Sequence, residues 1–148
     1  MVVAAASSRR KYGRPYGARR ELTIMNACPC GSGRDYDACC GPAHRGVAAD
    51  TAQALMRSRY SAYVRGDVDY LLASWHASTR PESLELEPAT RWLGLEVKRH
   101  AMTGVDTATV EFVARYRLGG APALRLHEIS RFVREDGRWY YVDGDFPR

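Results

Sequence analysis

Residues 28–40 of this 148-residue chain read CPCGSGRDYDACC and contain all four of its cysteines. One residue separates Cys28 from Cys30, and Cys39 and Cys40 are adjacent. A disulfide within either pair would be strained, so oxidation could only join one pair to the other. Four clustered thiolates instead suit tetrahedral Zn²⁺, whose structural sites hold four cysteines, or three cysteines and a histidine, at Zn–S distances of about 2.3 Å. We therefore expect a zinc site rather than disulfides.

The residues around the cysteines fit a loop that wraps a metal ion. Gly31 and Gly33 can adopt left-handed backbone conformations, and Ser32 can direct its hydroxyl or amide toward a thiolate. Tyr36 supplies one large apolar face for packing. The nearest alternative ligand is His44, but we expect it to be a surface histidine in the loop that leaves this region.

Beyond residue 49 the hydrophobic pattern predicts two helices. Asp50 and Gln53 form a capping pair at the start of the first helix, and apolar residues then recur every three or four positions, which indicates one buried stripe. Gly66 ends this helix. Asp67 can cap a second helix, which ends before Pro81. The stripe consists of Ala52, Leu55, Met56, Tyr60, Tyr63 and Val64.

From Trp92 onward apolar residues recur every second position, which indicates β-strands. The expected strands cover residues 93–97, 108–116, 124–133 and 139–142. Gly119-Gly120 marks a turn, and Asp136-Gly137 is a hairpin signal. Two helices followed by antiparallel strands predict an α+β domain with its helices on one face of a curved sheet.

The cysteine-rich segment resembles the SEC-C motif, a zinc-binding knuckle found at the carboxyl end of the SecA translocase and in many other bacterial proteins. The resemblance implies that Cys28, Cys30, Cys39 and Cys40 bind one structural Zn²⁺. SecA-type copies often use histidine as the fourth ligand and carry lysines after the second glycine. This chain has Cys40 and Arg34 at those places, which weakens the argument for a basic docking face.

The rest of the chain is similar to the YchJ family, bacterial proteins of unassigned molecular role with a SEC-C knuckle before a nuclear transport factor 2-like domain. The resemblance covers Met25 to Phe146 and implies a cone-shaped α+β fold. We expect a zinc knuckle over residues 25–46 and the nuclear transport factor 2-like domain over residues 47–148. The motifs that carry the resemblance are Leu55-Met56-Arg57-Ser58-Arg59-Tyr60, Tyr70-Leu71, Trp75-His76, Trp92-Leu93-Gly94-Leu95, His127-Glu128 and Trp139-Tyr140-Tyr141-Val142-Asp143-Gly144.

The net charge of +5 lies entirely in residues 1–24, which hold six basic residues and one acidic residue. Residues 25–148 are neutral, so nucleic-acid binding is not expected. We predict that residues 1–24 form a disordered basic leader, or are an artefact of the start site if Met25 is the initiator. No apolar run is long enough to span a bilayer, and we expect a cytoplasmic protein.

Folds of this kind often hold a pocket between helices and sheet, so polar residues on the predicted strands are candidate acid–base groups. The candidates are Glu128, His127 and Asp143. Strict alternation places Glu128 and His127 on opposite faces of the third strand, and it places Asp143 on one face with Trp139 and Tyr141.

The alternative is an ion pair that joins helix to sheet, formed by Arg57 or Arg59 with Glu128 or Asp143. This alternative is favoured, because the chain has no nucleophile elbow, phosphate loop or dinucleotide motif. Five aromatic residues are likewise expected in the core rather than around a ligand: Tyr60, Tyr63, Trp75, Trp92 and Tyr141.

The sequence thus favours a zinc-binding interaction module over an enzyme. A Zn²⁺ with four protein ligands has no open position at which to activate water. SEC-C kinship alone suggests that a protein partner is an export or ribosomal component. The alternative is an acid–base enzyme, or a small-ligand binder, that uses the cone pocket.

Overall fold

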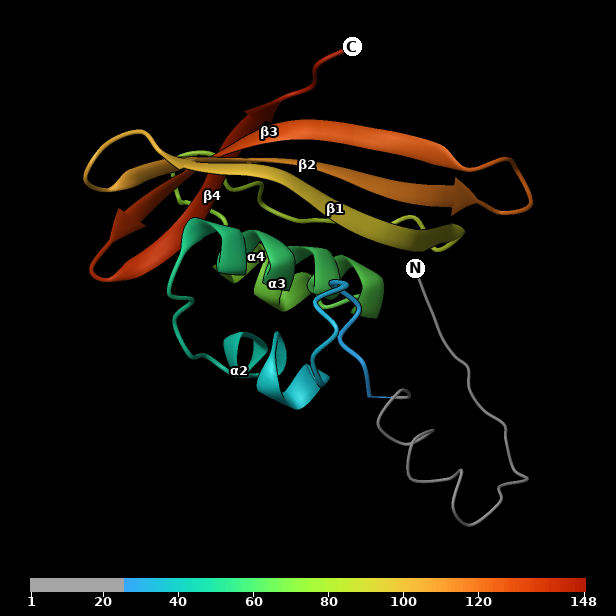
Figure 1. Cartoon of the computed structure of the whole chain (residues 1–148), viewed down its shortest axis with the longest axis horizontal. Helices are drawn as coiled ribbons and strands as arrows, with labels where there is room; N and C mark the ends of the chain where they lie inside the picture. The colour runs from blue at the N-terminus through green and yellow to red at the C-terminus, as the bar shows by residue number, and fades with distance from the viewer. Residues whose placement is uncertain (1–25) are drawn as a thin grey trace.

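The computed structural model describes residues 26–148, and the predicted leader lies outside this range. Figure 1 shows the sheet as one layer, helices α3 and α4 beneath it, and α2 with the N-terminal loop on the far side of α3. This arrangement confirms the predicted α+β class. The elements are η1 Tyr36–Ala38, α2 Gly41–His44, α3 Ala52–Arg65, α4 Val68–Ala73, β1 Thr90–Met102, β2 Thr107–Leu118, β3 Leu124–Glu135 and β4 Arg138–Asp145. Among these residues no helix is long and apolar enough to cross a membrane.

The N-cap of helix α3 lies one residue after the predicted N-cap, Asp50. Its N-cap is Thr51 rather than Asp50, because the Thr51 carbonyl accepts the first helical hydrogen bond, from the Leu55 N–H at 3.0 Å. The Thr51 hydroxyl also accepts the Ala54 N–H. Gly66 ends the helix at φ 74°, a left-handed conformation that glycine adopts without strain, as predicted.

Helix α3 is buried on two sides, whereas the pattern predicted a single apolar stripe. Met56 and Tyr60 are buried against the cavity beneath the sheet. Ser58 and Ser61 are equally buried, but their side of the helix faces the cysteine-rich segment. Because this second side is polar, its burial leaves no hydrophobic signal in the sequence.

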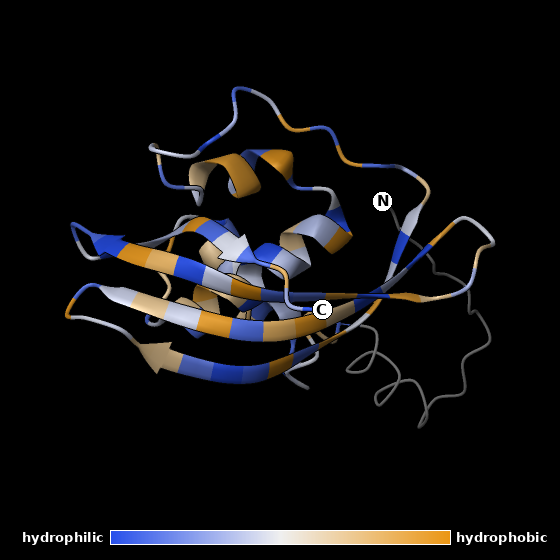
Figure 2. Ribbon diagram, turned by 90° about the horizontal axis from the view of Figure 1, so that it is seen from above, coloured by the Kyte–Doolittle hydropathy of each residue, from blue (hydrophilic) through white to orange (hydrophobic). Residues whose placement is uncertain are grey.

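The four strands form an antiparallel meander in the order β1-β2-β3-β4. In its register Phe112 lies opposite Glu128 and Val110 lies opposite Ser130, so these residues share the face toward the helices. Figure 2 shows the polar and apolar alternation along the strands. The turn between β3 and β4 consists of Asp136 at φ 53° and Gly137 at φ 79°, which confirms the predicted two-residue hairpin.

A β-bulge at Val142 overturns the predicted face of Asp143. Tyr141 pairs with Phe132, but Asp143 pairs with Arg131, so Val142 is the extra residue. A single extra residue reverses the alternation of side chains beyond it. Tyr141 therefore faces the helices, and Asp143 lies on the outer face of the sheet.

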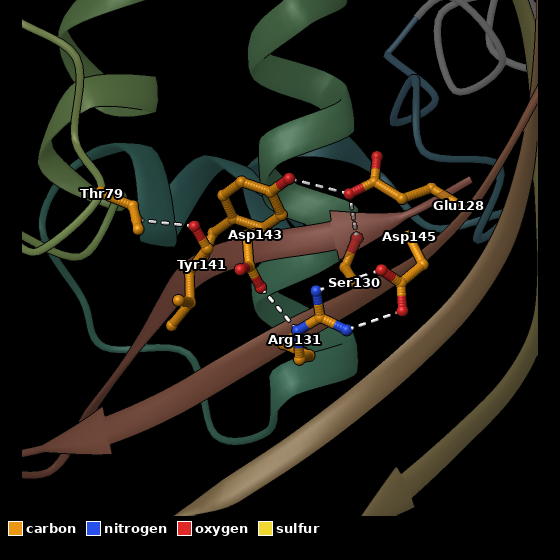
Figure 3. Close-up of polar contacts among 8 residues, drawn as sticks. Thr79, Glu128, Ser130, Arg131, Tyr141, Asp143 and Asp145 are labelled. Atoms are coloured by element: carbon orange, nitrogen blue, oxygen red, sulfur yellow. Dashed lines mark hydrogen bonds and ion pairs between the residues drawn. The ribbon is translucent and has the colours of Figure 1, made fainter.

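The outer edge of β4 is covered by the segment that follows α4. Tyr141 donates its backbone N–H to the Ser74 carbonyl at 2.9 Å and accepts the His76 N–H at 2.7 Å. The Thr79 hydroxyl then donates to the Val142 carbonyl at 2.6 Å (Figure 3). This connection fixes Trp75 beside Tyr141 and so builds one wall of the cavity between α3 and the sheet.

Candidate functional site

The first two cysteines are carried by a tight hairpin. Ala27 and Asp35 form an antiparallel bridge, and the Cys28 N–H donates to the Arg34 carbonyl at 2.9 Å. Gly31 and Gly33 turn the chain at φ 80° and 82°, the left-handed conformations that were predicted for them.

The last two cysteines come from the end of a short turn. Asp35 caps η1 by accepting the Asp37 N–H, and the Cys39 N–H donates to the Tyr36 carbonyl at 3.0 Å. Cys40 then begins α2 as its N-cap. The hairpin and the turn thus present two thiols each to the same point.

The four thiols form a compact cluster, with every sulfur within 4.8 Å of the others. The Sγ atoms of Cys30 and Cys39 are 3.6 Å apart, and all four cysteines are free thiols. Cys28, Cys30 and Cys40 are buried, and Cys39 is half-buried. Soft thiolate sulfurs in a closed group of four are the donor set of a structural zinc site, so these residues fit Zn²⁺.

Because the four thiols lie close together, their pKa values shift in different directions. Hydrogen bonds from Cys28 and Cys40 hold the pKa of the Cys30 thiol far below its ordinary value, while the bonds from Cys28 and Cys30 raise the pKa of Cys40. Burial raises the pKa of the Cys39 thiol. A divalent cation bound here would displace the remaining protons.

Polar side chains around the cluster orient the thiols from both sides. The Ser32 hydroxyl lies 3.1 Å from the Cys39 sulfur, as the sequence predicted. From helix α3, the Ser61 hydroxyl lies 3.4 Å from the Cys28 sulfur. Arg57 of the same helix donates to the Cys30 carbonyl at 2.8 Å.

Sequence reasoning missed this contribution of α3, although one signal was present. Arg57, Ser58 and Ser61 are polar residues at helical spacing directly beside the apolar stripe. Such a polar face normally indicates solvent, and only the position of residues 28–44 shows that it is an interface.

His44 is not the surface histidine that was expected. It ends α2 and is half-buried, with Nε2 2.8 Å from the Ser58 carbonyl and Nδ1 2.7 Å from the Tyr36 hydroxyl. A carbonyl only accepts, so Nε2 carries the proton and Nδ1 accepts from Tyr36. Burial lowers the pKa of His44 and raises that of Tyr36, which keeps both groups neutral. Both ring nitrogens are used, and His44 does not join the thiol cluster.

A cavity of about 340 Å³ lies between α3 and the inner face of the sheet. All five aromatic residues predicted for the core line it: Tyr60, Tyr63, Trp75, Trp92 and Tyr141. Of the three candidate acid–base groups, only Glu128 reaches this cavity. Glu128 is 7% exposed, and its Oε2 accepts from the Ser130 and Tyr141 hydroxyls at 2.8 Å each (Figure 3). Burial raises the pKa of Tyr141, which remains a donor.

The other two candidates lie on the outer face of the sheet. His127 contacts Glu111 at 2.7 Å. Asp143 accepts from Arg131 at 2.6 Å, beside a second pair between Arg131 and Asp145 (Figure 3). His127 and Asp143 are therefore separated from Glu128 by the sheet itself.

The predicted ion pair between helix and sheet is also wrong. Arg59 donates to the Leu71 carbonyl and the Ser74 hydroxyl, and it makes no ion pair with a carboxylate in residues 26–148. Its guanidinium carbon lies 5.0 Å from the Trp75 ring centre and 4.6 Å from that of Tyr141. Tyr141 thus lies between the cation and Glu128, because its ring faces Arg59 and its hydroxyl reaches the carboxylate.

Known families and structures match both the cysteine-rich segment and the α+β domain of this chain. Residues 51–144 match the model for the YchJ middle NTF2-like domain, and residues 26–42 match the SEC-C motif. The chain is 60% identical over 123 residues to a UPF0225 protein of Xanthomonas campestris pv. campestris strain 8004, which covers 82% of this chain and 95% of that protein. It is 62% identical over 125 residues to a UPF0225 protein of Cupriavidus metallidurans, which covers 80% of this chain and 87% of that protein. A SEC-C motif containing protein from Rhodopseudomonas palustris, solved in solution, has a TM-score of 0.71 and 38% identity, covering 82% of this chain and 98% of that one.

Proposed function

Because this chain belongs to the UPF0225 family, with a SEC-C motif ahead of a YchJ-type NTF2-like domain, we propose that it is a zinc-binding protein. Cys28, Cys30, Cys39 and Cys40 would hold one structural Zn²⁺. The observation that carries this proposal is the convergence of all four sulfurs within 4.8 Å in a mostly buried cluster. When bound, the ion supplies a cross-link between the hairpin and the turn that follows it.

Metal analysis of protein purified under reducing conditions tests this proposal. We expect about one zinc per chain, and none in the Cys39→Ser, Cys40→Ser double variant. Ala38→Ser is the matched control, because it adds a hydroxyl at an exposed neighbouring position and keeps all four thiols. A zinc content far below one in the wild-type protein, with two disulfides instead, contradicts the proposal.

The role that we propose for the knuckle is to present a fixed surface to a protein partner. Contacts with α3 anchor its inner side, while Gly33, Arg34, Asp37 and Ala38 are exposed on its outer side. SEC-C kinship is the reason to look first among export and ribosomal components.

Capture from cell lysate can separate an interaction role from a purely structural one. The charge-reversed variant Arg34→Glu, Asp37→Lys alters the outer surface and keeps the cysteines. We expect it to retain zinc and to lose a protein that the wild-type chain captures. If the reversed and the zinc-free variants both capture what the wild type captures, the knuckle has only a structural role.

The geometry favours binding over acid–base catalysis. Of the three predicted acid–base residues, only Glu128 faces the cavity, since His127 and Asp143 lie across the sheet. A single carboxylate with two hydroxyl donors can hold a ligand.

A further inference from the structure

The cavity beneath the sheet has the size and lining of a small-molecule site. Its volume of about 340 Å³ is near the lower end for ligand pockets, so it suits a molecule of one or two rings. Most of its wall is apolar: Met56, Trp92, Phe112, Leu126 and Phe132 are among the lining residues. Phe146, which is 61% exposed, lies at this wall too and marks an open side.

Glu128 offers this cavity an unused hydrogen-bond acceptor. Both of its hydrogen bonds, from Ser130 and Tyr141, end on the same oxygen, Oε2. In residues 26–148 no hydrogen bond reaches Oε1. The side-chain polar atoms that are sealed from solvent without a partner are Trp75 Nε1, His100 Nε2 and Trp139 Nε1, and Oε1 is not one of them. Oε1 is therefore accessible, although the side chain as a whole is buried. A buried carboxylate oxygen without a partner is stabilised when a ligand brings a hydrogen-bond donor into the site.

The charge of Arg59 decides which donor suits Glu128. Arg59 is 6% exposed and lines the same cavity, stacked on Trp75 and Tyr141. One buried cation and one buried anion thus face a single space, separated by the ring of Tyr141. A charged ligand would lie close to a like charge there, which is costly in an apolar site. A neutral donor avoids this cost.

We propose that the cavity binds a small neutral alcohol or phenol with an aromatic or alicyclic body, whose hydroxyl donates to Glu128 Oε1. The aromatic walls hold the body of the ligand, and Glu128 fixes its orientation. This site goes beyond the zinc role and lies apart from the metal ligands, because none of its lining residues is a cysteine.

The first experiment titrates zinc-loaded, ¹⁵N-labelled protein with 2-naphthol and follows the indole N–H signals. Those of Trp75 and Trp92 should shift in a saturable way, whereas that of Trp139, which does not line the cavity, should not.

Leu126→Trp fills the cavity beside the small Ala114 and should weaken binding at least tenfold. Leu124→Trp is the matched control, because it lies on the same strand face at a 44% exposed position outside the lining. Equal binding by both variants overturns the proposal.

The second experiment tests the hydroxyl through ligand choice on the unaltered protein. We expect 2-naphthol to bind at least tenfold more tightly than naphthalene, 2-naphthoate or protonated 2-naphthylmethylamine. Glu128→Gln should reduce that preference over naphthalene. Tightest binding of the carboxylate would assign the site to Arg59 instead, and tightest binding of the amine would show that Glu128 acts as a charge. Either result, or the absence of saturable binding, overturns the neutral-alcohol assignment.

Discussion

His44 joins α2 to η1 and to α3 through its two ring nitrogens. Replacing it by alanine removes its hydrogen bonds to the Ser58 carbonyl and to the hydroxyl of the half-buried Tyr36. We expect His44→Ala to lower the free energy of unfolding by about 1–3 kcal/mol, measured by urea denaturation of the zinc-loaded protein. His127→Ala is the control, because its pair with Glu111 is partly exposed and should contribute about 1 kcal/mol or less. Equal losses in both variants would contradict this account.

The stability contributed by His44 should depend on pH. Burial lowers the pKa of His44 below its ordinary value of 6.5, so the unfolded chain binds the proton more readily than the folded chain. The contribution is complete above about pH 6.5 and is lost as pH falls toward the folded pKa. The stability gap between wild type and His44→Ala should therefore narrow between pH 7.5 and pH 5.5 in parallel urea titrations. A constant gap would show that the imidazole titrates normally in the folded protein.

Gly144 is required by the carboxylate that lies over it. A Cβ at this position would overlap Glu128 Oε2 and lie 2.8 Å from both Cγ and Cδ. We expect Gly144→Ala to displace Glu128 and to destabilise the fold by about 1–3 kcal/mol in thermal or urea unfolding. Gly120→Ala provides the control, since nothing lies within 4 Å of its Cβ and its φ is not positive. Its effect should stay within about 0.5 kcal/mol.

At the scale of elements, α3 connects the knuckle to the cavity, and its polar side can be tested alone. Arg57→Ala removes the donor to the Cys30 carbonyl. We expect faster zinc transfer to a colorimetric chelator and a loss of about 0.5–1.5 kcal/mol in stability. Arg80→Ala is the control, because it removes two exposed hydrogen bonds to the Trp75 carbonyl, far from the cysteines. Identical transfer rates would show that α3 does not support the metal site.

The elements that sequence reasoning predicted well are those specified by neighbouring residues. Gly66, Asp67 and the Asp136-Gly137 turn act through local backbone geometry, and each has its predicted role. The bulge at Val142 was not predictable, because the register of β4 depends on pairing with β3 and with the segment after α4. The cysteine cluster was predictable from spacing alone, whereas the α3 side chains that support it come from a distant segment.

At the scale of the whole molecule, zinc should stabilise both parts, because α3 contacts the knuckle on one side and lines the cavity on the other. We expect chelation under reducing conditions to lower the melting temperature, and added Zn²⁺ but not Mg²⁺ to restore it. Free zinc at 1,000 times its Kd would contribute about 4 kcal/mol. Calorimetry of the metal-free and zinc-loaded forms gives the difference. Coincident transitions would contradict a folding role for the metal.

The unequal cover of the two sheet edges has a consequence for aggregation. An open strand edge can recruit a strand from another chain. At β4, residues 74–79 already occupy backbone groups of Tyr141 and Val142. At β1 the chain bulges between Trp92 and Gly94 and again between Val97 and Arg99. The charged Lys98 is the extra residue of the second bulge, and it pairs with Glu96 just before it. A strand that adds to the native protein would thus have to pair with β1, where the bulges and the charged side chains oppose it. Pairing with β4 at Tyr141 and Val142 would first require residues 74–79 to detach.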